Sequence, residues 1–463
     1  MANRWVRHVT SSSGWSRTRS RSSSERRYGR AVWAKAAGWY RRHRDSTFAE
    51  GCQRGALPGR RATLTSMPGA DPAALKERVV KAVDELADRL IEVSHEIHSH
   101  PELCYEERFA HDLLTDLLCQ AGLETERHAY DLETAFVARV GDTGPVVAVI
   151  CEYDALPGIG HGCGHNIIAG SGVGAGLAAA SIAAEAGGSV IVIGTPAEEG
   201  GGGKAKLIDR GAFAGVDAAM MVHPAGADMV SMNGIAIQQL EVEYFGEAAH
   251  AAAFPQHGRN ALDAAVLGYM NVAALRQHIR HDERVHGIFT RAGDKPNVVP
   301  SHTSALWYVR ARRLSTLEPL KDRVIACLEA GASAAGCEMS HNWAEPAYAD
   351  LVSNETIVAR YAANAATLGR QLGRPDAAAA VVGSTDMGNL SYVVPSIHPM
   401  IQVAPPEVVI HTPAFAQYAV SASGDQAVLD GAKALAMTVV DLWTDRTLLD
   451  RARSEWAERV GDE

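Results

Sequence analysis

Three short apolar runs in the first half of the chain constrain its fold more than any other sequence feature. They are Val146–Cys151, Val190–Gly194 and Ala218–Val222, and each has the length of a buried strand. Glycine-rich turns separate them, and an alanine- and glycine-rich segment, Ala169–Ala186, is typical of a close-packed helix between the first two. Strands that alternate with helices indicate an α/β fold with a mostly parallel sheet.

Each run is followed by residues that can bind a metal ion. These residues are Cys163 and His165 after the first run, Glu198 and Glu199 after the second, and His223 after the third. Open α/β sheets place their sites at the carboxyl ends of the strands. A thiolate, imidazoles and carboxylates in one place suit zinc, with manganese or cobalt as alternatives. Each residue alone has an ordinary structural explanation, but three successive strand ends of this kind indicate a metal site.

Four glycines, Gly200–Gly203, follow the Glu-Glu pair. They lack the lysine-then-hydroxyl ending of a phosphate-binding loop. We therefore interpret them as a flexible turn beside the metal.

The first structured element should begin at Asp71-Pro72, because aspartate caps helices and proline suits the first helical position. Apolar residues from Val79 to Ile97 then recur at spacings of four and three, which predicts one long helix. A second helix is expected over Glu107–Ala121, ended by Gly122.

After Pro224 the pattern changes to half-exposed strands and two helices, typical of a small α+β module. Its first helix, over Asn260–Ile279, should bury one apolar side. That side comprises Leu262, Val266, Tyr269, Val272, Ala273 and Leu275. We predict an inserted domain over residues 231–346, between catalytic segments 67–230 and 347–463.

Charge is distributed unevenly along the chain. The net charge is −10 overall, yet residues 1–66 carry +12, with 14 Arg and one Lys against three acidic residues. This leader resembles a transit peptide, a basic arm for nucleic acid or membrane, or sequence upstream of a true start at Met67. We expect a disordered leader or a misassigned start. For the chain as a whole, we expect no nucleic-acid partner and no membrane association, since no apolar run approaches the roughly 18 residues that span a bilayer.

Seven cysteines, an odd number, are scattered along the chain without a secretory signal before them. This usage is typical of a reducing compartment, where an unusual cysteine is more often a ligand or nucleophile than half of a disulfide. We therefore expect a cytoplasmic protein.

Four ordered motifs resemble metallopeptidase family 20. They are Asp-Ala-Leu-Pro at 154–157, His-Gly-Cys-Gly-His at 161–165, Pro-Ala-Glu-Glu-Gly at 196–200 and His-Thr-Pro-Ala-Phe at 411–415. The resemblance runs over residues 67–443. In pattern it is nearest to the branch of Xaa-Arg dipeptidases, beside the p-aminobenzoyl-glutamate hydrolases. It implies a catalytic α/β domain with two divalent metal ions and an inserted dimerisation lid.

The resemblance also implies roles for individual residues. The implied metal ligands are Cys163, His165, Glu199, His223 and His411. Glu198 would be the general base and Asp154 would orient a ligand. From the lid, His250 would steady the oxyanion at a neighbouring subunit's site, while Asn297 and Arg310 would hold the substrate carboxylate. For Arg310, a charge on the exposed face of a lid strand is an equal alternative.

The chain departs from the wider family at two positions. Glu152 stands where the family has a histidine ligand, and Asn166 stands where the auxin-conjugate branch has aspartate. Both leave the number of metal ions open. His398 is a rival of His411 for the last ligand, and Asp386 is either a pocket residue or a loop cap.

The predicted function is metal-dependent hydrolysis of an amide bond, in dipeptides with a basic C-terminal residue or in N-acyl amino acids. A divalent ion supplies an acidic water at neutral pH, and Glu198 can take its proton and return it to the leaving amine. The alternatives are an aroyl-glutamate amidase and, outside enzymes, a metal-binding dimer without turnover. An intact base beside a ligand argues against the last alternative.

Overall fold

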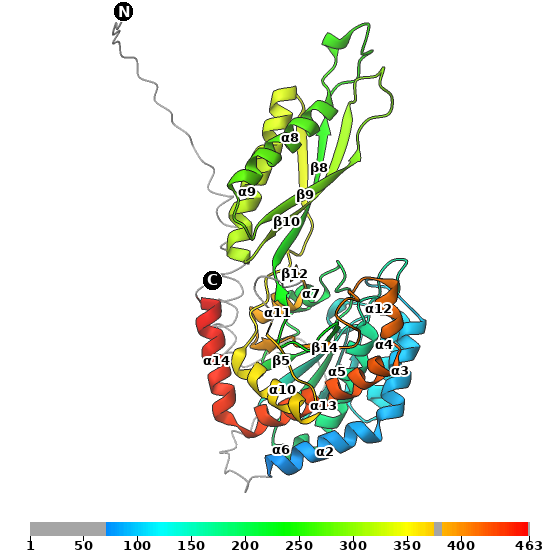
Figure 1. The fold of residues 1–463 in the computed structure, drawn as a ribbon, viewed down its shortest axis with the longest axis vertical. Coiled ribbons are helices and arrows are strands. Elements are labelled where there is room, and N and C mark those ends of the chain that lie inside the picture. Colours follow the sequence, from blue (N-terminus) through cyan, green and yellow to red (C-terminus); the bar gives the residue numbers. More distant parts are fainter. Residues whose placement is uncertain (1–70, 375–381, 462–463) are drawn as a thin grey trace, which may run out of the picture. The chain divides into compact units, whose positions relative to one another are not determined.

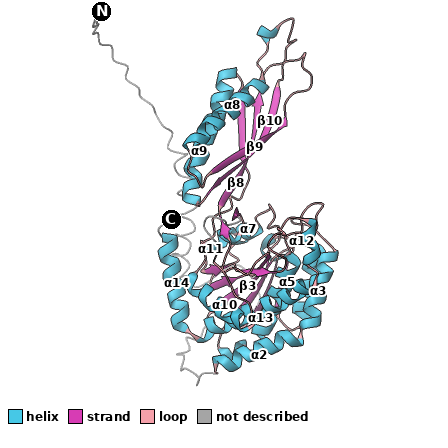
Figure 2. Cartoon of the chain, viewed as in Figure 1, coloured by secondary structure: helices cyan, strands magenta, loops and turns pink. Residues whose placement is uncertain are grey.

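The computed structural model describes residues 71–374 and 382–461 of the 463-residue chain. The expected leader, residues 1–66, lies outside the described residues. The described elements form a mixed α/β layer structure and a smaller four-stranded sheet with two long helices packed on it (Figures 1 and 2).

The large sheet has six strands, and four consecutive ones in space are parallel. Its spatial order is β1 (Glu124–Arg127), β2 (Phe136–Val140), β4 (Ser189–Gly194), β3 (Val146–Cys151), β5 (Ala218–Met220) and β13 (Ser396–Ile397). β4, β3, β5 and β13 run parallel, while β1 and β2 pair antiparallel at one edge. The prediction of a mostly parallel α/β sheet is therefore confirmed.

Strand β3 shows why its sequence is apolar throughout rather than alternating. Val147 and Val149 pack in one buried core, whereas Ala148 and Ile150 pack in another on the opposite face. A parallel strand covered on both faces has no solvent side, so every position favours an apolar residue.

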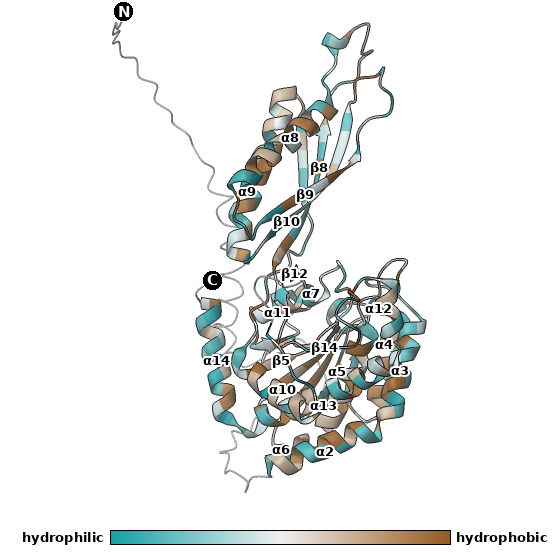
Figure 3. Ribbon diagram, viewed as in Figure 1, coloured by the Kyte–Doolittle hydropathy of each residue, from teal (hydrophilic) through white to brown (hydrophobic). Residues whose placement is uncertain are grey.

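Eleven helices accompany this sheet among the described residues. They are α2 (Pro72–Glu85), α3 (Ala87–Ser99), α4 (Arg108–Gln120), α5 (His165–Ala180), α6 (Ala183–Ala186), α7 (Gly203–Asp209), α10 (Glu355–Thr367), α11 (Met387–Ser391), α12 (Pro413–Tyr418), α13 (Ala422–Thr444) and α14 (Arg446–Gly461). None of the helices in the described part of the chain is long and apolar enough to cross a membrane. In Figure 3, α2, α3 and α14 each mix hydrophilic and hydrophobic colours, as expected of helices with one face in solvent.

The first helix begins as predicted, because the Asp71 side chain accepts a hydrogen bond from the Ala73 amide at 3.1 Å. The prediction of one long helix is wrong, since the chain breaks at Leu86 into α2 and α3. The two halves pack into different cores. Val79 packs in the core that contains α13, while Val93 packs in the core that contains α4. An uninterrupted periodicity cannot reveal that its two ends have different partners.

The smaller sheet has four antiparallel strands. Its order is β11 (Glu338–Trp343), β8 (Ala236–Phe245), β10 (His302–Ala311) and β9 (Arg284–Arg291). Helices α8 (Ala261–Leu275) and α9 (Leu314–Ala335) pack on it. These elements lie within the predicted insertion, whose limits at residues 231 and 346 stay a prediction.

Helix α8 buries only part of the side that its large apolar residues predicted: Val272 is buried, and Tyr269 and Leu275 pack partly buried against the core, but Val266 is exposed. Its buried side carries small residues, including Ala264 and Gly268, while Val266 is 44% exposed and Met270 is 59% exposed. The reason is the close packing of α8 against α9: a Cβ added at Gly331 would lie 2.4 Å from both the Ala264 carbonyl oxygen and the Gly268 amide nitrogen. Backbones that approach this closely leave no room for large side chains between them.

This close packing predicts that Gly331→Val destabilises the smaller domain. Overpacking against backbone atoms costs about 1–3 kcal/mol and can cost more. Ala330→Val is the matched control, because Ala330 is exposed on the same helix. Urea unfolding of both variants measures the difference. Equal midpoints would contradict the packing of α8 on α9.

Candidate metal centre

The five residues predicted to bind metal lie in one cluster. Cys163, His165 and His223 form one group of potential ligands, and Cys163, Glu199 and His411 form a second. Within each group, the potential ligand atoms all lie within 4.8 Å of one another. Cys163 belongs to both groups, so its sulfur could contribute to a metal ion held by either one. The role of these five residues as metal ligands stays a prediction.

The sheet explains why residues so distant in sequence meet. Glu198 and Glu199 follow β4, and His223 begins a short strand, β6 (His223–Ala225), just after β5. Because β4, β3 and β5 are parallel neighbours, their carboxyl ends share one edge of the sheet. His223 is held there by pairing with β14 (Met400–Gln402).

The loop that carries Cys163 is fixed at both sides. Gly164 has φ +80°, and a Cβ added there would lie 2.6 Å from Pro224 Cγ, so glycine is required before α5 begins at His165. On the other side, the Gly162 carbonyl accepts a hydrogen bond from the His411 amide at 2.8 Å. His411 itself adopts φ +65°, a conformation that non-glycine residues seldom take. This contact brings His411 to the cysteine loop.

Asp154 connects two of the candidate ligands. Its Oδ1 lies 3.0 Å from His165 Nδ1, and its Oδ2 accepts the Glu199 amide hydrogen bond at 3.0 Å. Burial alone would raise the pKa of Asp154, but His165, the Glu199 amide and Lys204 lower it to about 2. The carboxylate therefore fixes the His165 ring and turns Nε2 toward the Glu-Glu pair.

The adjacent glutamates have opposite electrostatic character. Burial raises the pKa of Glu198 well above its usual value, reinforced by the carboxylates of Glu152 and Glu199. Burial also acts on Glu199, but the hydrogen bond and charge of His411, with Nε2 at 3.4 Å from Glu199 Oε1, lower the pKa of Glu199. The surroundings therefore favour the charged form of Glu199 and the protonated form of Glu198.

The cluster suits a divalent cation. His165 Nε2 is fully buried and has no hydrogen-bond partner among the described residues, and it lies 3.8 Å from Glu199 Oε1. A buried nitrogen without a partner is costly unless it binds something. The sulfur, nitrogen and oxygen donors around it form the mixed set that zinc prefers.

His398 remains the rival of His411. It is fully buried, its ring lies 5.3 Å from that of His223, and neither ring nitrogen has a hydrogen-bond partner in the described part of the chain. It belongs to neither group of potential ligands, whereas His411 belongs to one. This favours His411.

The three predicted lid residues lie outside the cluster. In the described structure, no hydrogen bond or ion pair joins His250, Asn297 or Arg310 to its members. His250 is exposed and its Nδ1 accepts from the amides of Ala252 and Ala253, while the Ala251 amide donates to the Asn297 carbonyl. Arg310 is half-buried on β10, where its guanidinium lies 5.7 Å from the Tyr308 ring.

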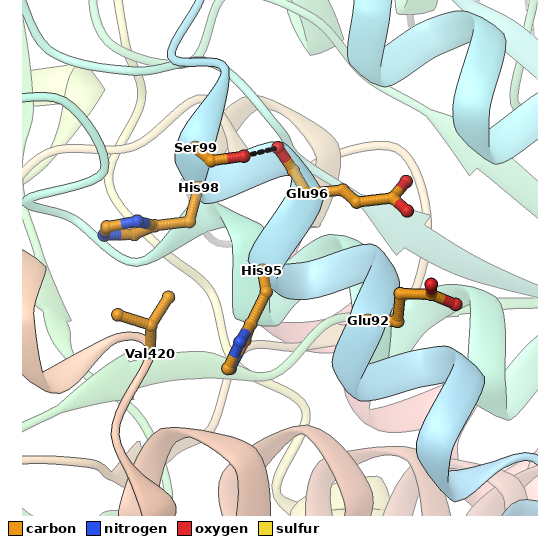
Figure 4. Close-up of a pocket in the computed structure, with 6 residues that line it drawn as sticks. All are labelled: Glu92, His95, Glu96, His98, Ser99 and Val420. Atoms are coloured by element: carbon orange, nitrogen blue, oxygen red, sulfur yellow. Dashed lines mark hydrogen bonds between the residues drawn. The ribbon is translucent and has the colours of Figure 1, made fainter.

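The surface pocket along α3 is a different place (Figure 4). Its lining is Glu92, His95, Glu96, His98, Ser99 and Val420, none of which is a predicted site residue. Its two histidines already have partners, with Asp425 Oδ1 at 2.7 Å from His95 and the Ala416 carbonyl at 2.8 Å from His98.

Sequence reasoning missed three residues that support the cluster. Lys204 is fully buried and pairs with Asp386, and the Tyr348 hydroxyl donates to the Glu198 carbonyl at 2.8 Å. Glu107 accepts the Ala197 amide hydrogen bond at 2.9 Å, just before the Glu-Glu pair. The only signal for Lys204 was its place after the four glycines.

The glycine turn is also not the flexible segment that we predicted. A Cβ added at Gly202 would lie 2.3 Å from Pro346 Cγ, and one at Gly203 would lie 1.8 Å from the Pro196 carbonyl oxygen. Gly202 and Gly203 are needed because proline and backbone atoms pack directly against them, whereas a Cβ at Gly200 would meet nothing within 4 Å.

Glu107 gives a pH-dependent prediction. Burial raises its pKa to about 7, against the hydrogen bond from Thr134, so the folded state binds the proton more tightly than the unfolded chain does. Proton binding by Glu107 therefore contributes its full stabilisation of the folded state below pH 4.5, and this contribution is lost as the pH rises through about 7. Relative to the wild type, Glu107→Gln should gain up to about 3 kcal/mol of stability between about pH 5 and pH 8. Thermal melts of both proteins in the presence of a chelator measure this difference. Melting temperatures that change with pH in the same way for the wild type and Glu107→Gln would contradict the prediction.

The fold and the donor set together define a metal-dependent hydrolase of amide bonds, and comparison with known proteins agrees. Residues 148–439 match peptidase family M20/M25/M40. The Xaa-Arg dipeptidase of Mus musculus is 41% identical over 416 residues, covering 86% of this chain and 96% of that protein. A p-aminobenzoyl-glutamate hydrolase chain of Escherichia coli is 35% identical over 277 residues, covering 54% of this chain and 56% of that protein.

A solved structure agrees on the fold. A dinuclear metal-binding M20 peptidase from Bacillus subtilis has a TM-score of 0.59 at 20% identity, covering 77% of this chain and 99% of its own. The chain belongs to peptidase family M20/M25/M40. The resemblance inferred from the four motifs is confirmed, as is the prediction of a hydrolase that uses divalent metal ions.

Proposed function

We propose that this chain hydrolyses dipeptides with a basic C-terminal residue, using two divalent ions held by the Cys163-centred cluster. The observation that carries the proposal is the pair of ligand groups that share Cys163 beside Glu198. Similarity to the mouse Xaa-Arg dipeptidase over 96% of its length supports the choice of substrate. The second candidate is an aroyl-glutamate substrate, supported by 35% identity to the E. coli p-aminobenzoyl-glutamate hydrolase chain.

Cys163, His165 and His223 would hold one ion, and Cys163, Glu199 and His411 the other. When bound, such ions make water acidic at neutral pH and polarise an amide carbonyl. Zinc is our first choice because of the thiolate, with manganese or cobalt as alternatives. Two divalent ions would also balance the local negative charge, since the site holds five buried carboxylates and a thiol but one lysine, Lys204. These carboxylates belong to Glu152, Asp154, Glu198, Glu199 and Asp386.

Glu198 acts as the general base in this scheme. Its carboxylate takes the proton of the attacking water and returns it to the leaving amine. Asp154 keeps His165 in the orientation and tautomer that leave Nε2 free. The raised pKa of Glu198 suits a group that must accept a proton from water and later release it to the leaving amine.

The lid residues complete the site in this proposal. His250 donates a hydrogen bond to the oxyanion at the site of a neighbouring subunit, and Asn297 and Arg310 bind the substrate carboxylate. The exposure of His250 suits contact with a second molecule, and a guanidinium pairs bidentately with a carboxylate.

We also place the protein in the cytoplasm, on the basis of its scattered cysteines.

A homodimer formed through the lid follows from the same scheme. The outward side of α8 exposes Val266, Leu267 and Met270, three large apolar residues close together in sequence. Exposed apolar residues grouped on one helix are typical of an interaction surface.

We predict that Met270→Glu weakens the dimer by at least about tenfold in Kd, because a charge would be buried in an apolar contact. Ala74→Glu, at an exposed position of α2, is the control and should leave the dimer intact. Sedimentation velocity distinguishes the two. A wild type that sediments as a monomer would refute the dimer itself.

The catalytic test uses a protein loaded with Zn, Mn or Co. Substrates are Xaa-Arg and Xaa-Lys dipeptides, N-acetyl amino acids and p-aminobenzoyl-glutamate. Glu198→Gln should lower kcat by about 10²- to 10⁴-fold and retain its metal, because it removes a proton acceptor and no ligand. Cys163→Ser should lose metal from both ligand groups, measured by elemental analysis.

The outcome on the panel decides between the two substrate classes. Fastest turnover of a dipeptide with a basic C-terminal residue supports the first proposal, and fastest turnover of p-aminobenzoyl-glutamate supports the second. Full activity of Glu198→Gln would refute the role of Glu198.

A further inference from the structure

Lys204 is among the largest side chains with no exposure in the described structure. Its ammonium lies 2.6 Å from Asp386 Oδ1 and also pairs with Glu152 Oε1. The Lys204 amide donates to the other oxygen of Asp386 at 2.8 Å. A buried ammonium is costly unless anions surround it, and two carboxylates do so here. These anions outweigh the effect of burial and keep the pKa of Lys204 above its usual value.

The group around Lys204 adjoins the candidate metal centre. Glu152 Oε2 lies 3.5 Å from His165 Nε2, the nitrogen that faces the Glu-Glu pair. Oxygens of Glu152, Glu198 and Asp386 lie within 4.8 Å of one another, a spacing that could also hold a metal ion. One ammonium therefore lies among three buried carboxylates, one of which is the proposed base.

The local backbone is built to deliver this lysine. Lys204 is the second residue of α7, directly after the glycine turn that packs against Pro196 and Pro346. Asp386 stands at the start of α11, far away in sequence, and both its oxygens face Lys204. A solvated lysine at the surface would need none of these contacts.

We propose that Lys204 is a positioning residue whose ammonium occupies the space between the carboxylates of Glu152, Glu198 and Asp386. Metal ions then bind only to the two sets of ligands that share Cys163. This inference rests on the proposed function. Without the ammonium, three carboxylates would form an oxygen-rich site of the kind that Mn²⁺ binds. Glu198 would then serve as a ligand there and would be lost as a base.

The test counts bound Mn²⁺ per chain by equilibrium dialysis and by the EPR signal of free Mn²⁺. The wild type should bind no more than two ions. Lys204→Met, similar in shape but uncharged, should bind one ion more and lose about 10- to 100-fold in kcat with KM nearly unchanged. Lys206→Met is the matched control on the same helix, since its ammonium lies over the Tyr105 ring, and it should behave as the wild type.

A second variant covers the case in which Lys204→Met does not fold. Lys204→Met/Asp386→Asn removes the ammonium and one carboxylate together. It should bind no extra ion, and its kcat should recover towards the wild-type value because Glu198 is no longer a ligand. A folded Lys204→Met protein with the wild-type metal count overturns the proposal, whatever its kcat. A double variant that binds no extra ion but keeps a low kcat, or a third tightly bound Mn²⁺ in the wild type, overturns it as well.

Failure of this proposal is distinct from failure of the proposed function. The latter fails if the wild type binds no metal or hydrolyses no substrate in the panel. The former fails on the metal count of the variants while the wild type remains active.

Discussion

Concentration of negative charge away from solvent is the constraint on which the site depends. Glu152, Asp154 and Asp386 are almost completely buried, close to Cys163 and the Glu-Glu pair. Burying anions costs several kcal/mol each unless cations or hydrogen bonds compensate them. Asp154 is compensated by His165 and a backbone amide, and Asp386 by Lys204. The remaining groups, centred on Cys163, have the donors that a divalent ion would satisfy.

The scaffold places these groups by close backbone contacts and by buried side chains that reach in from other elements. Parallel strands bring three loops to one edge, and Gly164 allows α5 to begin directly at His165. The Glu-Glu turn is held by Glu107 on one side and by the Tyr348 hydroxyl on the other. Tyr348 also pairs with Ile237, at the start of β8, so the turn that carries the base is bonded to the segment that leads into the smaller sheet.

Prediction from sequence succeeded where a pattern was local. The apolar run Val146–Cys151 is strand β3 to the residue, and Asp71 caps the helix that it was expected to cap. It failed where the partner of an element decides the outcome. Helix α8 buries Ala264 and Gly268 where Gly331 of α9 approaches it, whereas Val266, which periodicity placed on the buried side, is exposed.

The sequence by itself determined the fold class, the family and the five residues that meet around Cys163, because motifs and strand ends are written in consecutive residues. The tertiary structure alone decided how these residues are supported. Lys204 and Asp386 are 182 positions apart, and no spacing rule links them. Their contact arises because α7 and α11 pack together, and burial then makes each charge depend on the other.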